Sequence, residues 1–156
     1  DKIEDGQYPF FVRSATIETI NSFSLDCEAI LVPGEGNIGS IFHYICGRFD
    51  VHQRVYAITQ FAPEVSGKFV HLYMTRHFGA HAMQNSVKAT VDSLRLPTFQ
   101  NFEISIPSSK KEQSAIVAIL SDMDNELTTL ETQRDKARQL KQGMMQELMT
   151  GRVRLA

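Results

Sequence analysis

The last third of the chain is the part that most limits its fold. After Pro107 there is no further proline, and there are only two glycines, Gly143 and Gly151. Proline and glycine are the residues that most often end a helix, so this composition predicts one long helix. From Ser109 to Met149 it would reach about 60 Å at 1.5 Å per residue. A helix of that length projects beyond a small domain, and we expect a boundary near Pro107.

The start of this helix and its apolar face both carry sequence signals. Ser109 followed three residues later by Glu112 fits a capping box. Apolar residues then recur every three or four positions, except at Arg134, in a narrow near-heptad stripe typical of a coiled-coil seam. The stripe consists of Ile116, Leu120, Met123, Leu127, Leu130, Ala137, Leu140, Met144 and Leu148.

A long helix with so narrow a stripe needs something to pack against. Isolated helices are only marginally stable, and most helical stability in proteins comes from burying an apolar face. Gly143 inside the helix costs about 1 kcal/mol relative to alanine, which favours close approach by a neighbouring chain at that point. We therefore expect pairing with a second helix as an antiparallel coiled coil. The alternative is a stripe that folds back on its own domain.

The residues before Pro107 alternate short β-rich runs with glycine-bearing turns. Cys27 to Gly36 resembles a buried strand that ends in a glycine loop, and Gly39 to Ile58 resembles two strands joined around the sequence GRFD. Ser66 to Met83 is compatible with a helix, and Asn101 to Pro107 alternates as a half-buried strand does. The fold class is therefore α+β: a small mixed α/β domain followed by one long C-terminal helix.

Composition and cysteine content set further bounds. The chain is 42% hydrophobic and 22% charged, which suits one ordinary core. Cys27 and Cys46 show no metal-type spacing, and two cysteines cannot form a disulfide framework. We expect reduced, buried thiols in a cytoplasmic protein with no leader and no membrane-spanning helix. Because the chain begins with Asp1 instead of methionine, we expect a piece of a longer protein.

The C-terminal stretch resembles a known family. The run from IPSSKKEQSAIVAILSDMD to LETQRDKARQLKQGMMQELMTGRVRL is similar to the distal conserved helix of the specificity subunit of type I restriction-modification enzymes. The shared features are the proline, the EQ at Glu112 and Gln113, the following AI and the LKQGMMQELMTG ending. Upstream, Gly6 to Ser14, Ile30 to Ile58 and Asn85 to Pro107 follow the order of segments in the family's target recognition domain.

The resemblance implies a modular architecture. A complete family member has two target recognition domains separated by two long antiparallel helices, and each domain reads one half of a split DNA target. The helix pair sets the gap between the halves and docks adenine methyltransferase subunits, and through them the restriction subunits. By this comparison residues 1–107 form one recognition domain, residues 108–150 one helix and residues 151–156 a tail.

The resemblance also implies partners. The chain would be the C-terminal half of a specificity subunit, or a half-subunit that pairs with itself. Its partners would be double-stranded DNA, adenine methyltransferase subunits, and a second specificity half or a second copy through the long helix. It would need no cofactor, no metal and no membrane. The catalytic motifs of adenine methylation would lie on a separate subunit.

The charge balance sets a condition on DNA recognition. Up to Pro107 there are eight lysines and arginines against eleven aspartates and glutamates. Duplex DNA is held largely by neutralising its phosphates, so folding has to gather several dispersed basic residues on one surface. In the family a partner subunit also surrounds the DNA, which relaxes this condition.

Three stretches supply most candidate DNA contacts: GEGNIG, HQR and, as the strongest candidate, TRHFGAHAMQNSVKA from Thr75 to Ala89. Glycines in GEGNIG would let the backbone approach a phosphate and offer Asn37 to a base edge; the alternative is a plain turn. We place HQR in a strand, so alternation sends His52 and Arg54 to one face. Arginine to guanine or glutamine to adenine is the usual direct readout of bases; the alternative is that these residues lie on the surface or brace a loop. The full set is Asn37, Arg48, His52, Gln53, Arg54, Arg76, His77, His81, Gln84, Asn85, Ser86 and Lys88.

No catalytic constellation stands out. The sequence contains no Walker-type phosphate loop, no GxSxG elbow and no HExxH motif. The spacing of His71, His77 and His81 matches no zinc motif. We therefore predict a non-enzymatic recognition and assembly component. Two other classes stay open: a coiled-coil protein adaptor with no DNA readout, and a small metal-dependent enzyme that uses these histidines.

Overall fold

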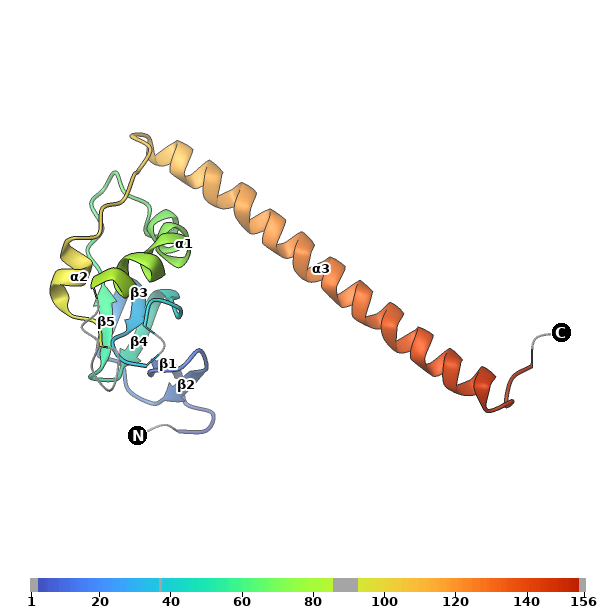
Figure 1. The fold of residues 1–156 in the computed structure, drawn as a ribbon. Helices are drawn as coiled ribbons and strands as arrows, with labels where there is room; N and C mark the ends of the chain where they lie inside the picture. The colour runs from blue at the N-terminus through green and yellow to red at the C-terminus, as the bar shows by residue number, and fades with distance from the viewer. Residues whose placement is uncertain (1–2, 37, 86–92, 155–156) are drawn as a thin grey trace. The chain divides into compact units, whose positions relative to one another are not determined.

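The computed structural model describes residues 3–36, 38–85 and 93–154, apart from the side chain of Asn85. It divides into two compact units, residues 1–117 and residues 118–156. The expected α+β class and the long C-terminal helix are confirmed (Figure 1). The elements are β1 (Tyr8–Phe11), β2 (Ile17–Ile20), β3 (Leu25–Pro33), β4 (His43–Val51), β5 (Val55–Ile58), α1 (Gly67–Asn85), α2 (Leu96–Gln100) and α3 (Lys110–Met149).

The strands form one five-stranded mixed sheet in the order β2-β1-β4-β3-β5. The β1–β4 pair is parallel and the other pairs are antiparallel. The two strands expected between Gly39 and Ile58 exist, but the expected joint at GRFD is wrong. Gly47 lies inside β4 with φ +130°, a backbone conformation that favours glycine, and the strand continues through it to Val51. The turn comes later, where the Val55 amide donates to the His52 carbonyl over 2.9 Å.

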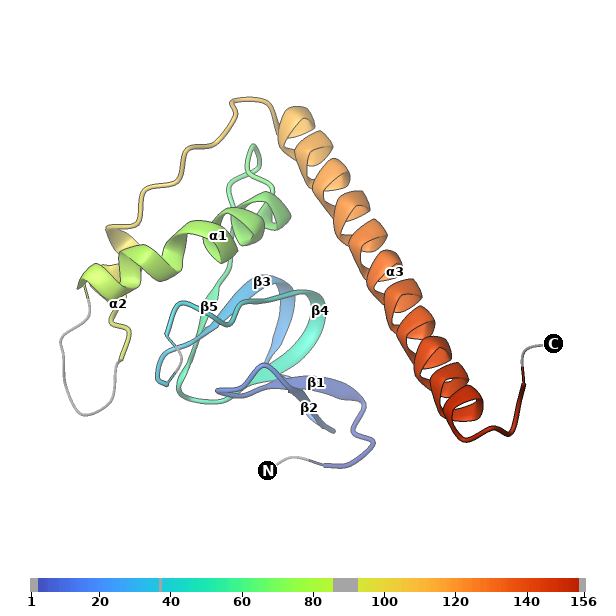
Figure 2. The same cartoon turned by 45° about the vertical axis from the view of Figure 1, so that its right-hand side comes forward.

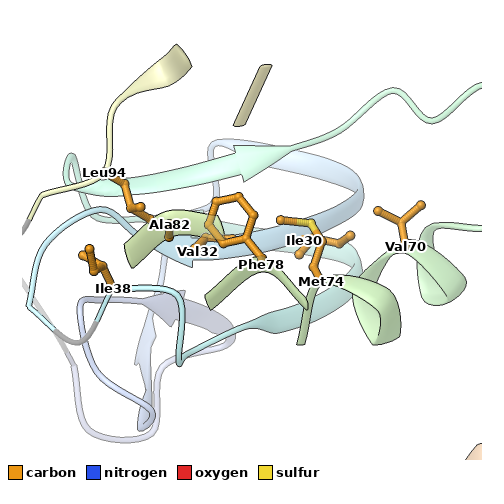
Figure 3. Packing of buried hydrophobic residues seen from close by; sticks show 8 residues of the cluster. All are labelled: Ile30, Val32, Ile38, Val70, Met74, Phe78, Ala82 and Leu94. Atoms are coloured by element: carbon orange, nitrogen blue, oxygen red, sulfur yellow. The ribbon is translucent and has the colours of Figure 1, made fainter. Parts of the chain in front are cut away.

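Strand β3 is buried on both faces, and each face carries its own cluster. Helix α1 presents Val70, Met74, Phe78 and Ala82 every four residues to one face of the sheet. Figure 3 shows these side chains directed toward Ile30, Val32, Ile38 and Leu94. On the other face, Phe11, Ala29, Leu31 and Phe49 form the second cluster. Figure 2 accordingly shows α1 and the β1–β2 hairpin on opposite sides of β3 and β4.

The strand expected at Asn101 to Pro107 is not present. The segment alternates in burial, with Phe102 and Ile104 packed against the α1 cluster, but no β-ladder includes it. Phe102 lies against the rings of Tyr73 and Phe78, at centroid distances of 6.1 and 5.1 Å, and both belong to α1. A helix has no free backbone edge for a strand to pair with, so the segment has a strand's burial pattern without its hydrogen bonds.

The two thiols are less buried than expected. Both cysteines are free; Cys27 is half-buried and Cys46 is exposed. Cys46 pairs with Glu28, whereas the fully buried part of β3 begins at Ala29. The expectation failed because Cys46 lies just outside the covered part of the sheet.

A buried glutamine holds the first turn of α3 against the rest of the first unit. Gln113 is 1% exposed. Its Oε1 accepts a hydrogen bond from the Ser66 amide at 2.8 Å. Its Nε2 donates to the Pro107 carbonyl at 2.8 Å and to the Glu64 carbonyl at 3.1 Å. All the hydrogen-bonding capacity of this amide except one acceptor site is therefore used.

Candidate nucleic-acid interface

The loop after β3 is fixed at its first end by two other segments. We call residues 34–39 the glycine loop. The Gly34 amide donates to the Arg54 carbonyl over 2.9 Å, and the Leu94 amide donates to the Gly34 carbonyl over 2.8 Å. Glu35 forms an isolated antiparallel bridge with Ser93. A Cβ on Gly34 would lie 2.9 Å from the Tyr56 ring, so glycine allows the aromatic ring to close over the loop.

The second end of the glycine loop rests on α1. A Cβ built on Gly39 would come within 2.7 Å of the Gly79 Cα, and one on Gly79 within 2.7 Å of the Gly39 carbonyl oxygen. Gly39 also has a φ of +68°, which favours glycine. Next to this contact, Ile38 packs with Ala82 in the core. The glycine loop thus connects the turn between β4 and β5 to the C-terminal half of α1.

A charged group lies at the first end of the loop. The carboxylate of Glu35 pairs with the guanidinium groups of Arg13, at 3.1 Å, and Arg54. We call these three residues the Glu35 cluster. Beside it is a cavity of about 180 Å³, lined by Gly34, Glu35, Gln53, Arg54, Val55 and Tyr56. Neither Arg13 nor Glu35 was among the predicted contacts, because ion pairs between residues distant in sequence leave no local pattern.

The residues His52, Gln53 and Arg54 lie in a turn, so their predicted placement in a strand is wrong. Strand β4 ends at Val51 and β5 begins at Val55. The His52 amide donates to the Phe11 carbonyl at 2.9 Å, and its buried Nδ1 has no partner within the described residues. Gln53 and Arg54 are exposed. The turn presents their side chains at its tip, where the one-face alternation of a strand does not apply.

Arg48 lies away from the other candidates. It pairs with Asp26 at 3.0 Å and lies over the Phe23 ring. Asp26 is near the start of β3, whereas Arg54 is bonded to Gly34, just past its end. At about 3.3 Å per residue these points are more than 20 Å apart along the strand. The structure therefore does not place Arg48 with the Glu35 cluster.

Helix α1 contributes the remaining described candidates. Arg76, His77 and Gln84 are exposed, and Arg76 lies one turn before Gly79, the residue in contact with the glycine loop. His81 donates from Nε2 to the Thr98 carbonyl at 3.0 Å and packs on Phe102, which braces α1 against the following segment. The predicted contacts Asn37, Ser86 and Lys88, and the side chain of Asn85, lie outside the described residues.

The histidines of α1 do not converge on a metal-like site. His71 donates from Nε2 to the Phe42 carbonyl at 3.4 Å, and burial lowers the pKa of its imidazole. The ring of His77 instead lies 4.5 Å from that of Tyr73. Among the residues that the structure describes, no group of three or more His, Cys, Asp or Glu side chains could hold a metal ion.

The second unit carries the predicted apolar stripe. The stripe leucines and methionines from Leu120 to Leu148 are exposed, from 37% at Leu148 to 66% at Leu140. Exposed apolar side chains in such a row mark an interaction surface. The stripe is therefore available for a partner along most of α3.

The end of the stripe is hollowed. After α3, Gly151 adopts a φ of +71°, and the amides of Arg152 and Val153 donate to the Glu147 carbonyl at 3.1 and 3.3 Å. This cap turns the chain back and brings Val153 beside the stripe. The resulting groove of about 460 Å³ is lined by Gln139, Leu140, Gly143, Met144, Glu147, Leu148 and Val153. Gly143 leaves its floor open.

Comparison with known proteins gives these surfaces a context. The family described as type I restriction modification DNA specificity domain matches residues 1–139. The chain belongs to this family. The specificity domain is therefore a non-catalytic recognition component, as predicted from the sequence.

The specificity domain is also similar to individual relatives. It is 27% identical over 138 residues to the type I restriction enzyme EcoDI specificity subunit of Escherichia coli, covering 88% of the chain and 29% of that subunit. A crystal structure of the type I restriction-modification S subunit from M. genitalium superposes with a TM-score of 0.67 and 21% identity, over 94% of this chain and 39% of that one. A structure from a study of complex assembly and conformational transition of the type I system gives a TM-score of 0.66 and 16% identity, over 92% and 38%.

The chain thus spans less than half the length of the relatives it matches. The solved structures share its fold, including the small domain followed by a long helix. Within the described residues, no helix is long and apolar enough to cross a membrane.

Proposed function

We propose that this specificity domain reads one half of a bipartite DNA target for a type I restriction-modification system. The observation that carries the proposal is the glycine loop, which joins the exposed Gln53 and Arg54 to the helix bearing Arg76. Arginine and glutamine are the side chains that most often read guanine and adenine edges in the major groove. The family match supports DNA over the protein adaptor, the alternative reading of the sequence.

We further propose that α3 pairs with a second long helix in antiparallel orientation, and its charge order supports this. Between residues 122 and 141, four of the five acidic residues lie before Thr132, at Asp122, Asp124, Glu126 and Glu131, and all four basic residues lie after it, at Arg134, Lys136, Arg138 and Lys141; the fifth acidic residue, Asp135, lies among the basic ones. Two copies in antiparallel register centred on Thr132 bring each acidic segment against a basic one.

Three pairs of stripe positions fit the same register, whereas Met123, Leu130 and Leu140 meet Lys141, Arg134 and Asp124. Ile116 and Leu148 lie equally far from Thr132 on its two sides, as do Leu120 and Met144. Two-fold pairing of identical helices needs such self-complementarity, because each residue meets its mirror position in the partner. Leu120 of one copy then faces the groove over Gly143 and Met144 of the other. This close approach would explain why a glycine, which is unfavourable inside a helix, occupies position 143.

The register predicts which cysteine variants will cross-link. In a variant that lacks Cys27 and Cys46, we expect Leu120→Cys/Met144→Cys to form a covalent dimer under mild oxidation. We expect Leu120→Cys/Leu127→Cys to stay largely monomeric, because in this register the nearest pair of cysteines is ten residues, or about 15 Å, apart along the helix axis. Non-reducing electrophoresis measures the outcome. Equal cross-linking of both variants would contradict the proposed register.

We also propose that the helix pair docks adenine methyltransferase subunits. Each helix buries one narrow stripe in the pair, which leaves its other faces to a second partner. Those subunits would carry out catalysis, and the specificity domain would position them on the DNA target.

The experiment that tests the function is selection from random-sequence duplexes. The chain is co-expressed with its adenine methyltransferase subunit, and the chain alone is the control. We expect the complex to recover a short fixed motif that contains adenine, either once or as two halves with a constant gap. A folded complex that recovers no motif would exclude target recognition and favour the adaptor.

Lys88 provides a test of phosphate contact. We expect Lys88→Ala to weaken binding evenly across duplex sequences and to reduce the slope of log affinity against log salt by about one. The control is Lys68→Ala, an exposed lysine in the first turn of α1 that lies over the Tyr44 ring. Titration of labelled duplexes at several salt concentrations measures both. A changed sequence preference would mean that Lys88 contacts a base.

A further inference from the structure

A carboxylate inside a DNA-reading surface needs an explanation. Glu35 lies in the glycine loop, next to the cavity lined by Gln53 and Arg54, and its own negative charge would repel a phosphate. Its side chain is 24% exposed, while those of Arg13 and Arg54 are 53% and 56% exposed. Exposed ion pairs contribute little to stability, so stabilising the fold does not explain why two arginines meet at one acid.

We propose that Glu35 is a positioning residue that determines specificity, because it holds the guanidinium of Arg54 in the orientation that reads a base edge. The inference rests on the proposed DNA recognition and assigns a role within it. A guanidinium carries five N–H donors in a planar fork. Glu35 is bonded to the Nη1 groups of Arg54 and Arg13, which leaves most donors of both arginines for another acceptor.

The backbone around Glu35 is built to keep this orientation. Its neighbour Gly34 is bonded to the Arg54 carbonyl, and Glu35 itself bridges to Ser93. The acid and the arginine are therefore fixed to one another through both main chain and side chain. A side chain held in place before binding loses less conformational freedom when it binds.

The charge arrangement favours a base over a phosphate as the target of Arg54. An arginine that only neutralises phosphate is weakened by a neighbouring carboxylate, which cancels part of its attraction. An arginine that reads guanine O6 and N7 depends on geometry and benefits from being held. Arg13 offsets the remaining negative charge, so the cluster keeps a net charge of +1 and does not repel the duplex.

The test compares specific and non-specific binding in the complex with the methyltransferase subunit. After selection has given the target motif, affinities are measured for the motif and for a scrambled duplex. We expect Glu35→Gln, which keeps the size but removes the charge, to lower the ratio of the two affinities roughly tenfold or more, the discrimination of one bidentate contact. Affinity for the scrambled duplex should stay the same or rise.

Two further variants separate positioning from charge and from folding. Asp26→Asn removes the same charge from the Arg48 pair at the other end of β3 and should leave the ratio unchanged. Arg54→Lys keeps the positive charge but loses the fork, and should lower the ratio as Glu35→Gln does. Because Glu35 acts through Arg54, the double variant should be no worse than either single one.

Each outcome decides something. An unchanged ratio in Glu35→Gln, or additive losses in the double variant, would overturn the role of Glu35 while leaving DNA recognition standing. If Glu35→Gln does not fold, an unchanged ratio in Arg54→Lys overturns it. Failure of the wild-type complex to select any motif would overturn both the inference and the proposed function.

Discussion

Leu127→Asp is expected to convert the paired protein into a monomer while the recognition domain stays folded. Leu127 is 58% exposed in the single chain and lies opposite Ala137 in the proposed register. Pairing would bury the new carboxylate against apolar side chains without a partner, which is strongly unfavourable. Because the pair is two-fold symmetric, both copies carry the substitution and its cost in binding free energy is incurred twice. We therefore expect the dissociation constant to rise by a factor of about a hundred or more.

Light scattering measures the result directly, since the chain has a mass of 17.6 kDa and the pair twice that. Leu140→Asp, in the same stripe, should behave alike. The matched control is Thr132→Asp, which adds the same charge on the side of the helix away from the stripe. An unchanged mass for both leucine variants would show that the stripe does not mediate pairing.

Gln113→Leu is expected to destabilise the first unit by about 2 to 4 kcal/mol. The substitution leaves the Ser66 amide and the carbonyls of Glu64 and Pro107 without their hydrogen bonds in a buried site. Each buried polar group left unpaired costs about 1 to 3 kcal/mol, less where water can enter. The change in size is small, so lost packing adds little.

Urea unfolding measures this loss, and hydrogen exchange locates it. We expect the Ser66 amide, at the start of α1, to lose protection before the amides of β3 do. Gln142→Leu makes the same change at an exposed position of the same helix and should alter stability by less than about 0.5 kcal/mol. Equal stability of the two variants would mean that water or a shifted helix replaces the bonds of Gln113.

The features that the sequence predicted well are those with local, repeating signals. Helix α3 begins at Lys110, directly after the expected cap residue, and ends at Met149. Helix α1 was expected from Ser66 to Met83 and runs from Gly67 to Asn85. Strand β3 and the loop after it also lie where expected. In the helices, apolar residues repeat at helical spacing along the whole element. In β3, the change from apolar residues to glycines marks where the strand ends.

The features that the sequence did not reveal depend on contacts between distant segments. GRFD reads locally as a turn, but pairing with β3 extends β4 through it, up to Val51. Asn101 to Pro107 reads as a strand because its burial alternates, and only the position of α1 shows that no strand edge is near. Helix α2 has only five residues, which are too few to show the repeat of apolar residues that identifies a helix.

The candidate site divides in the same way. Gln53 and Arg54 were chosen by residue type, and the structure supplies the turn that exposes them. Glu35 and Gln113 were missed, although each is present in a quoted motif, because an acid in a glycine loop and a glutamine in a helix are ordinary alone. Their roles follow from partners 19 and 47 residues away, Arg54 and Ser66.

The contact between Gly39 and Gly79 sets a rule for engineering new target preferences into this scaffold. A loop transplanted from a relative in place of residues 34–39 would have to bring a residue without Cβ to the same point, or α1 would be pushed away. A shift of α1 would in turn move Phe78 and Ala82, which form part of the core. Grafts should therefore retain Gly39, Gly79 and the buried Ile38, and vary only the loop positions that face solvent.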